Sequence, residues 1–221
     1  MSLREKKAAA MHRQMLDTAE LMIRQSGGTD FSMRALAASA EVSPTTPYNF
    51  FGSKEGLLYE LLERNLKSFM KDGLAEAQDP IAHAIDSIDN AVAMLLRDPV
   101  LLRPLYQVML GLTDPVHHPR FLKRAFSFYR SALDPAVARK LVDAKEQTTL
   151  ACAMMAHLMG VLDLWVHEDI DDDGFRVHVA YGIVHLLWPY ARGKSLTCLK
   201  QRFEELRKRA AKHPVPKFLG A

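Results

Sequence analysis

Residues 31–58 read FSMRALAASAEVSPTTPYNFFGSKEGLL, and this stretch decides the fold of the chain. Its pattern predicts a short helix with Ser32 as N-terminal cap, a tight turn at residues 41–42, and a second short helix capped by Ser43. Ser53 is expected to cap a longer helix that follows. Two short helices joined by a tight turn are the layout of a helix-turn-helix, whose second helix enters the major groove of DNA.

The second short helix and its flanks carry side chains suited to DNA. Thr45 and Thr46 are short hydrogen-bond donors at its start, and Ser43 leaves the positive helix end free to face phosphate. Tyr48 offers a phenol, and Asn49 offers an amide that can pair with adenine. Two further cations flank the helix and are expected to reach phosphate, or guanine in the first case: Arg34 and Lys54.

This stretch resembles the DNA-binding region of the TetR family. The family pattern is an aromatic or aliphatic residue, a Thr/Ser cap, an Ile/Leu-Ala pair, a Gly-Val-Ser turn, Thr-x-Tyr-x-x-Phe and Ser-Lys-Glu-x-Leu-Leu. The matching positions are Phe31, Ser32, Leu36, Ala37, Glu41, Val42, Ser43, Thr46, Tyr48, Phe51, Ser53, Lys54, Glu55, Gly56, Leu57 and Leu58. The resemblance covers roughly residues 8–60 at motif level and the whole chain in length and helix layout.

The resemblance implies roles for individual residues. Thr46, Tyr48 and Lys54 fall where the family contacts phosphate. Pro44, Thr45 and Asn49 fall where it reads bases. The expected DNA contacts are therefore Arg34, Ser43, Pro44, Thr45, Thr46, Tyr48, Asn49 and Lys54.

Two residues depart from the family pattern. Glu41 replaces the glycine of the turn, and holding a non-glycine residue at positive φ costs on the order of 1 kcal/mol. Pro47 lies about four positions into the expected second helix, where it removes a backbone donor and disfavours helical angles at Thr46. We therefore expect an irregular start of this helix, with a local 3₁₀ turn.

Bulk composition bounds the class of protein. The chain has 221 residues, a net charge of +3 and only two cysteines, Cys152 and Cys198, which are expected to be isolated thiols. Residues 1–56 are almost balanced in charge, and the basic excess lies in residues 196–221. No secretion signal or membrane span is recognised, so a cytoplasmic protein is expected. Neither an HExxH motif, nor a Gly-rich phosphate loop, nor a nucleophile–base pair is present, so we expect no enzyme, no cofactor and no metal, although nine histidines leave a metal site as an alternative.

Helical spacing runs through the whole chain and predicts an all-α fold. Residues 1–52 are expected to form the helix-turn-helix DNA-binding domain, with three helices. Residues 53–212 are expected to form a helical effector-binding and dimerisation domain, in which 53–72 is a connecting helix, and 213–221 a C-terminal tail. Residues 117–118 are expected in a loop, and a helix from Asp134 is expected to reach the region of residues 145–147.

Two long apolar helices, near residues 147–168 and 173–191, are expected to pair with their copies in a four-helix bundle, as the resemblance implies. The expected dimer contacts are Met154, Leu158, Leu162, Phe175, Val179, Gly182, Ile183 and Leu186. The alternative is that these stripes fill only the subunit's own core.

The resemblance also implies an effector cavity in this domain. Large, adaptable or amphipathic side chains are the candidates for its lining. They are Met94, Leu102, Tyr106, Met109, Phe126, Tyr129, Met155, Met159 and Trp165. As a set they favour a mainly apolar effector, while ordinary core packing remains the alternative for each of them.

These expectations describe a regulator that binds a palindromic operator in double-stranded DNA as a homodimer and releases it when a small molecule binds. Two alternatives remain open. One is a DNA-binding architectural or activating protein without a small-molecule effector. The other is a helical binding protein that has lost DNA recognition, for which Pro47 is the suspicious feature.

Overall fold

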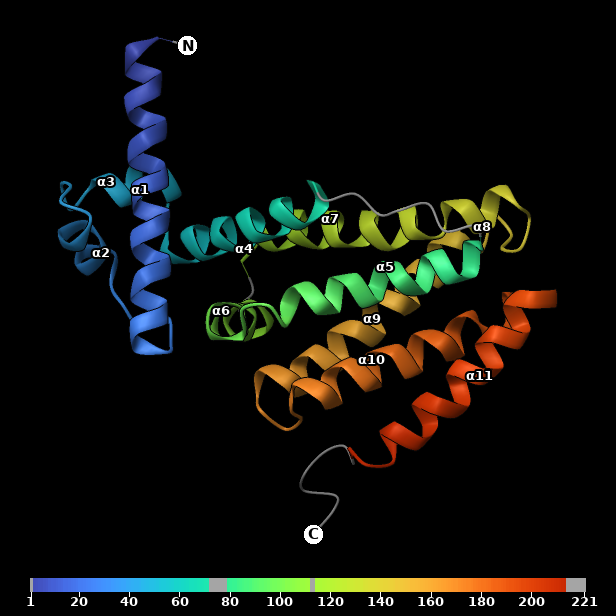
Figure 1. Cartoon of the computed structure of the whole chain (residues 1–221). Coiled ribbons are helices and arrows are strands. Elements are labelled where there is room, and N and C mark those ends of the chain that lie inside the picture. Colours follow the sequence, from blue (N-terminus) through green and yellow to red (C-terminus); the bar gives the residue numbers. More distant parts are fainter. Residues whose placement is uncertain (1, 72–78, 112–113, 214–221) are drawn as a thin grey trace. The chain divides into compact units, whose positions relative to one another are not determined.

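The computed structural model describes residues 2–71, 79–111 and 114–213, and every regular element in these ranges is a helix (Figure 1). The all-α class expected from the sequence is confirmed. The chain divides into two compact units. Met1–Lys71 with Asp98–Phe121 forms the N-terminal unit, and Asp72–Arg97 with Leu122–Ala221 forms the C-terminal unit.

The N-terminal unit is built around one long helix. Its elements are α1 (Leu3–Ser26), α2 (Met33–Ser39), α3 (Thr46–Phe51), α4 (Lys54–Lys71), α6 (Pro99–Gly111) and the start of α7 (His117–Ala132). α2 and α3 lie beside α1, and the first turns of α1 extend past α3 (Figure 1). α6 packs against both α1 and α4.

Local sequence explains the ends of α1. Ser2 and Glu5 form a reciprocal capping box at its start. Gly27 ends the helix with φ 72°, a left-handed conformation that glycine adopts without steric cost. Arg64 of α4 binds Asp17 at 2.5 Å and also binds Glu20, so ion pairs fix α4 to α1.

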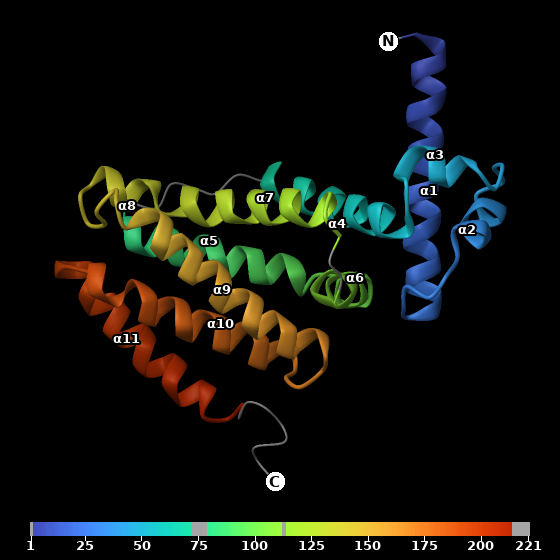
Figure 2. The same cartoon turned by 180° about the vertical axis from the view of Figure 1, so that it is seen from behind.

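The C-terminal unit is centred on α10. Its elements are α5 (Pro80–Leu95), the remainder of α7, α8 (Asp134–Ala138), α9 (Gln147–Val166), α10 (Asp172–Leu187), a 3₁₀ turn (Trp188–Tyr190) and α11 (Gly193–Ala210). α10 packs against α9, α11 and α5, and α11 runs along it on the side away from α9 (Figures 1 and 2).

Close contact between α9 and α10 depends on one glycine. The His157 ring of α9 occupies the space where a Cβ at Gly182 would lie, with its Nε2 only 2.1 Å from that position. The same Nε2 lies 3.1 Å from the carbonyl oxygen of His178 and 3.3 Å from that of Val179. At the other end of this helix pair, Trp165 stacks on Phe175 with ring centroids 5.1 Å apart.

The two apolar stripes proposed as a dimer interface lie mostly inside the subunit. The side chains buried within the single chain are Met154, Leu158, Leu162, Phe175, Val179 and Ile183. Gly182 and Leu186 are half-buried. Most of these residues therefore fill the chain's own core, in agreement with the alternative interpretation.

Two expected boundaries are wrong. Residues 117–118 belong to α7 rather than to a loop, because the carboxylate of Asp114 accepts the backbone N–H groups of Val116 and His117 and so starts the helix early. The helix from Asp134 is only five residues long and ends at Ala138. Lys140 follows at φ 57°, a left-handed conformation that stops helical propagation.

Candidate nucleic-acid interface

The turn between α2 and α3 has the expected geometry. Glu41 lies at φ 54°, so the residue that stands in place of the family's glycine does adopt the left-handed region. Ser32 caps α2 as predicted, with its Oγ accepting the N–H of Ala35 at 3.0 Å. Beyond the turn, the N–H of Val42 donates to the carbonyl of Ala37 at 3.0 Å, which closes the end of α2.

The start of α3 differs from the expectation. Ser43 does not cap the helix; α3 begins at Thr46, and the flanking Thr45 makes no side-chain cap bond. The N–H of Thr46 donates to the carbonyl of Ser43 at 2.9 Å, an i to i−3 bond that forms the expected 3₁₀-type turn. Pro47 therefore falls in the first turn of α3, where its missing N–H costs no intrahelical bond.

α3 has one buried face and one exposed face. Pro47 and Phe51 are buried and hold the helix on its unit. Thr45, Tyr48 and Asn49 are exposed, and Tyr48 retains 53% of its surface. A tyrosine exposed to this extent does not belong to the core. The Thr45 hydroxyl, the Tyr48 phenol and the Asn49 amide therefore lie together on the exposed side of α3.

The remaining expected contacts surround this exposed face. Arg34 on α2, Ser43 and Pro44 are exposed, and Thr46 is half-buried. Lys54, in the first turn of α4, is half-buried with its Nζ 5.3 Å above the ring of Phe31. The Oγ of Ser53 accepts the N–H of Gly56 at 3.0 Å, so the predicted cap of α4 is confirmed.

α1 braces the helix-turn-helix from behind. The ring of His12 lies 4.9 Å from that of Phe51, and its Nε2 is 2.7 Å from a carboxylate oxygen of Glu60 in α4. Gln14 donates from its amide to the carbonyl of Ala40 at 3.0 Å, at the end of α2. These contacts join α2, α3 and α4 to α1, and we call this assembly the DNA-binding head. A site on such a support is held more precisely than a site on a loop.

The distribution of charge on α1 was missed from the sequence. Its first turns are exposed and carry four cations, Arg4, Lys6, Lys7 and Arg13. Asp17 and Glu20 of α1 offset part of this positive charge in a simple count. Both are bound by Arg64 of α4, so their charges are already neutralised. Pairing with α4 could not be inferred from α1 alone, and it leaves the exposed end of α1 basic.

The residues expected to line an effector cavity are divided between the two units. Leu102, Tyr106 and Met109 are buried in the N-terminal unit, where burial raises the pKa of the Tyr106 phenol. In the C-terminal unit Tyr129 and Trp165 are buried. The half-buried members of that unit are Met94, Phe126, Met155 and Met159.

The sequence comparison and the structural comparison both match regulators of the TetR family. Residues 15–61 match the family described as bacterial regulatory proteins, tetR family. A TetR transcriptional regulator from Rhodococcus sp. RHA1 superposes with a TM-score of 0.62 at 18% identity, covering 81% of this chain and 96% of that chain. A proposed TetR-family transcriptional regulator from Mesorhizobium loti MAFF303099 gives a TM-score of 0.57 at the same 18% identity and the same coverage, 81% and 96%. No curated protein matches the sequence.

Proposed function

We propose that this chain is a TetR-family transcriptional regulator that represses its target by binding a palindromic operator as a homodimer until a small-molecule effector releases it. The observation that carries the DNA-binding proposal is the exposed face of α3. Thr45, Tyr48 and Asn49 project from a helix that is too short to need them for packing. A major groove about 12 Å wide admits such a helix.

The proposed contacts divide into two kinds. Thr45 directly precedes α3 and Asn49 lies one turn further on the same exposed side, and Asn49 can pair with adenine through two hydrogen bonds. Tyr48 and Lys54 are proposed to bind phosphate, which fixes the position of the protein without reading sequence. The basic first turns of α1 are proposed to add phosphate contacts beside α3, because they extend past it within the same unit (Figure 1).

An uncovered apolar helix supports the proposed homodimer. α9 is long and apolar enough by composition to cross a membrane, yet only 44% of its apolar window is buried within the chain. Its exposed stripe consists of small residues, Cys152, Ala156 and Gly160, spaced four apart. A second copy would bury this stripe, and small side chains permit a close helix–helix approach.

Release by an effector requires that α4 change its position. In the N-terminal unit, the Tyr59 hydroxyl of α4 lies 3.0 Å from Nδ1 of His118 in α7, and burial raises the pKa of Tyr59. α7 continues from this unit into the C-terminal one. A ligand that favours one arrangement of α7 would shift the population of head positions, with a coupling of about 1–3 kcal/mol.

Selection from a random duplex library tests the proposal. The purified chain is incubated with randomised 30-base-pair duplexes (a length of about three helical turns), and bound DNA is amplified and sequenced over several rounds. We expect an inverted repeat whose half-sites lie about 34–36 Å apart. Failure to enrich any motif would reject sequence-specific binding. Enrichment of a single half-site would reject the homodimer while keeping DNA recognition.

A further inference from the structure

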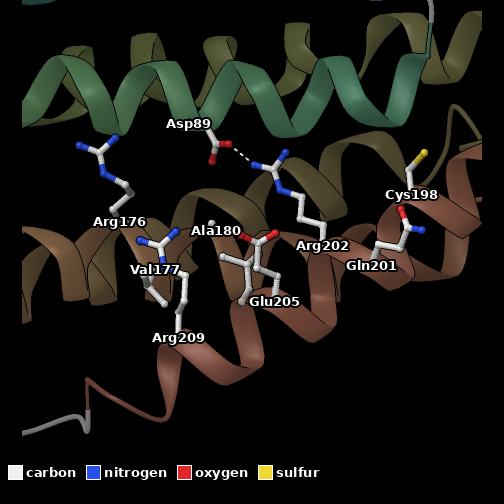
Figure 3. Close-up of a pocket in the computed structure, with 10 residues that line it drawn as sticks. Asp89, Arg176, Val177, Ala180, Cys198, Gln201, Arg202, Glu205 and Arg209 are labelled. Atoms are coloured by element: carbon white, nitrogen blue, oxygen red, sulfur yellow. Dashed lines mark hydrogen bonds and ion pairs between the residues drawn. The ribbon is translucent and has the colours of Figure 1, made fainter.

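A cleft of about 470 Å³ opens in the C-terminal unit between α5, α10 and α11 (Figure 3). It lies wholly within one unit, and its lining contains none of the nine residues expected around an effector. The lining residues are Asp89, Arg176, Val177, Ala180, Cys198, Gln201, Arg202, Glu205, Leu206 and Arg209. Three of the ten lining residues are arginines, so the cleft is rich in cationic side chains.

The arginines are held in different ways. Arg202 binds Asp89 of α5 and lies 3.6 Å from Asp86, so its position is fixed. Arg209 is tied to Asp173 at 2.8 Å through one of its terminal nitrogens. A guanidinium has five N–H donors, so Arg209 keeps donors for another acceptor.

Arg176 and Glu205 form no ion pair among the described residues, although Arg176 lies near enough to Asp89 to stabilise its carboxylate. In Figure 3 the guanidinium groups of Arg176 and Arg209 lie at the same end of the cleft, and the Glu205 carboxylate lies between Arg209 and Arg202. Two neighbouring guanidinium groups with spare N–H donors suit a carboxylate.

Burial makes the wall of the cleft sensitive to charge. The pKa of Asp89 is raised because burial disfavours its carboxylate more than Arg202 stabilises it. The Asp89 and Arg202 side chains keep 37% and 34% of their surface exposed, so their charges interact somewhat more strongly than in open water. The floor is apolar, because Val177, Ala180 and Leu206 are buried beneath the polar groups.

We propose that this cleft binds a small organic acid that carries one carboxylate, a short apolar body and a hydrogen-bond donor. The carboxylate pairs with Arg176 and Arg209, and the body lies on Val177, Ala180 and Leu206. The donor group faces Glu205, whose negative charge also selects against a second anionic group on the ligand. The assignment of this acid as the effector of the regulator rests on the proposed function. Binding of the acid to the cleft does not depend on that function.

Binding is measured without DNA by isothermal titration calorimetry of the full chain. The probes are 4-hydroxybenzoate and 6-hydroxyhexanoate, each compared with its uncharged amide. We expect at least one acid to bind with a dissociation constant of about 1 mM or lower, and neither amide to bind within about tenfold of that value.

Matched variants locate the effect. Arg176→Gln should abolish binding of the acid, while Arg207→Gln should leave it unchanged. Arg207 is exposed on α11 and outside the cleft lining, so this control removes the same charge from the same unit. Circular dichroism confirms that both variants fold, and Arg176→Lys replaces Arg176→Gln if the latter does not.

Three outcomes overturn the proposal: no binding of either acid, equal binding of acid and amide, or binding that survives loss of Arg176. None of them bears on DNA recognition by α3, which duplex selection tests separately. Conversely, a chain that selects no DNA motif can still bind the acid in this cleft.

Discussion

Asn49 and Lys54 have different proposed roles on the same duplex, and single substitutions separate them. Asn49→Ala should remove a two-bond contact with a base, cost about 1–3 kcal/mol on the selected operator and relax sequence preference at one position of each half-site. Lys54→Ala should weaken binding to all sequences about equally and lower the salt dependence by about one phosphate contact per subunit. Fluorescence anisotropy over a salt series measures both effects.

Identical salt slopes for wild type and Lys54→Ala would contradict the phosphate role. Asn49→Ala that leaves the sequence preference intact would contradict base reading. Glu41→Gln provides a comparison, since it also alters an exposed residue of the helix-turn-helix but lies in the turn rather than on α3.

Asp114 gives a pH-dependent prediction. Its carboxylate accepts the N–H of His117 at 2.5 Å and that of Val116 at 2.9 Å, and these bonds lower the pKa of Asp114. A carboxyl group whose pKa is lower in the folded state stabilises the fold above its unfolded pKa of about 3.9, and loses that contribution as pH falls further. Asp114→Asn should therefore lower Tm at pH 7, and the difference from wild type should vanish near pH 2–3.

Calorimetry of both proteins between pH 2.5 and 7 measures this difference. A gap in Tm that is constant across the series would show that the charge on Asp114 does not contribute, and that the asparagine merely packs less well.

Individual caps were predictable because each was the only candidate in its position. Ser32 and Ser53 each precede a helical pattern and face no competing hydroxyl, and Glu41 had to occupy the turn by its spacing. The start of α3 was not predictable. Hydroxyls stand at positions 43, 45 and 46, and the backbone bond from Thr46 to Ser43 that decides among them is visible only in three dimensions.

At the scale of elements, the contact between α9 and α10 yields a double-mutant prediction. Alanine normally stabilises a helix interior relative to glycine by about 1 kcal/mol. At Gly182 we expect the opposite, a loss of about 1–3 kcal/mol, because the new Cβ meets the His157 ring. In the His157→Ala background the ring is gone, and Gly182→Ala should be neutral or stabilising.

Chemical denaturation of the four proteins in this cycle gives the coupling free energy. Additive effects of the two substitutions would mean that His157 moves aside freely and that Gly182 is not required for the approach of α9 to α10.

Which face of these helices meets which neighbour could not be predicted. α9 and α10 are apolar on most sides, so helical spacing favours no single stripe, and six of the eight residues expected at an interface are buried within the chain. The existence, approximate length and order of the long helices were predictable. These depend on the helical spacing of apolar residues and on prolines that start helices, such as Pro80 and Pro99. Faces depend on tertiary packing, which one chain's pattern does not encode.

At the scale of the whole molecule, the exposed stripe of α9 sets the proposed state of assembly. Ala156→Arg places a charge in the middle of the stripe, where burial without a partner is costly. We expect it to convert a dimer into a monomer in analytical ultracentrifugation at micromolar concentration. Ala138→Arg makes the same substitution at an exposed residue of α8 and should leave the dimer intact.

The assembly state also determines affinity for the operator. Two linked heads bind a palindrome with an effective local concentration that one head lacks, so loss of the dimer should reduce affinity for the full palindrome by about 100-fold or more. Affinity of the same Ala156→Arg protein for a single half-site should change less than about twofold, because α3 and its flanks are untouched. A protein that stays dimeric after Ala156→Arg would move the interface away from α9. A monomer that keeps full affinity for the palindrome would show instead that each head reads its half-site independently, and the requirement for a fixed spacing between heads would then fail along with the proposed route of release.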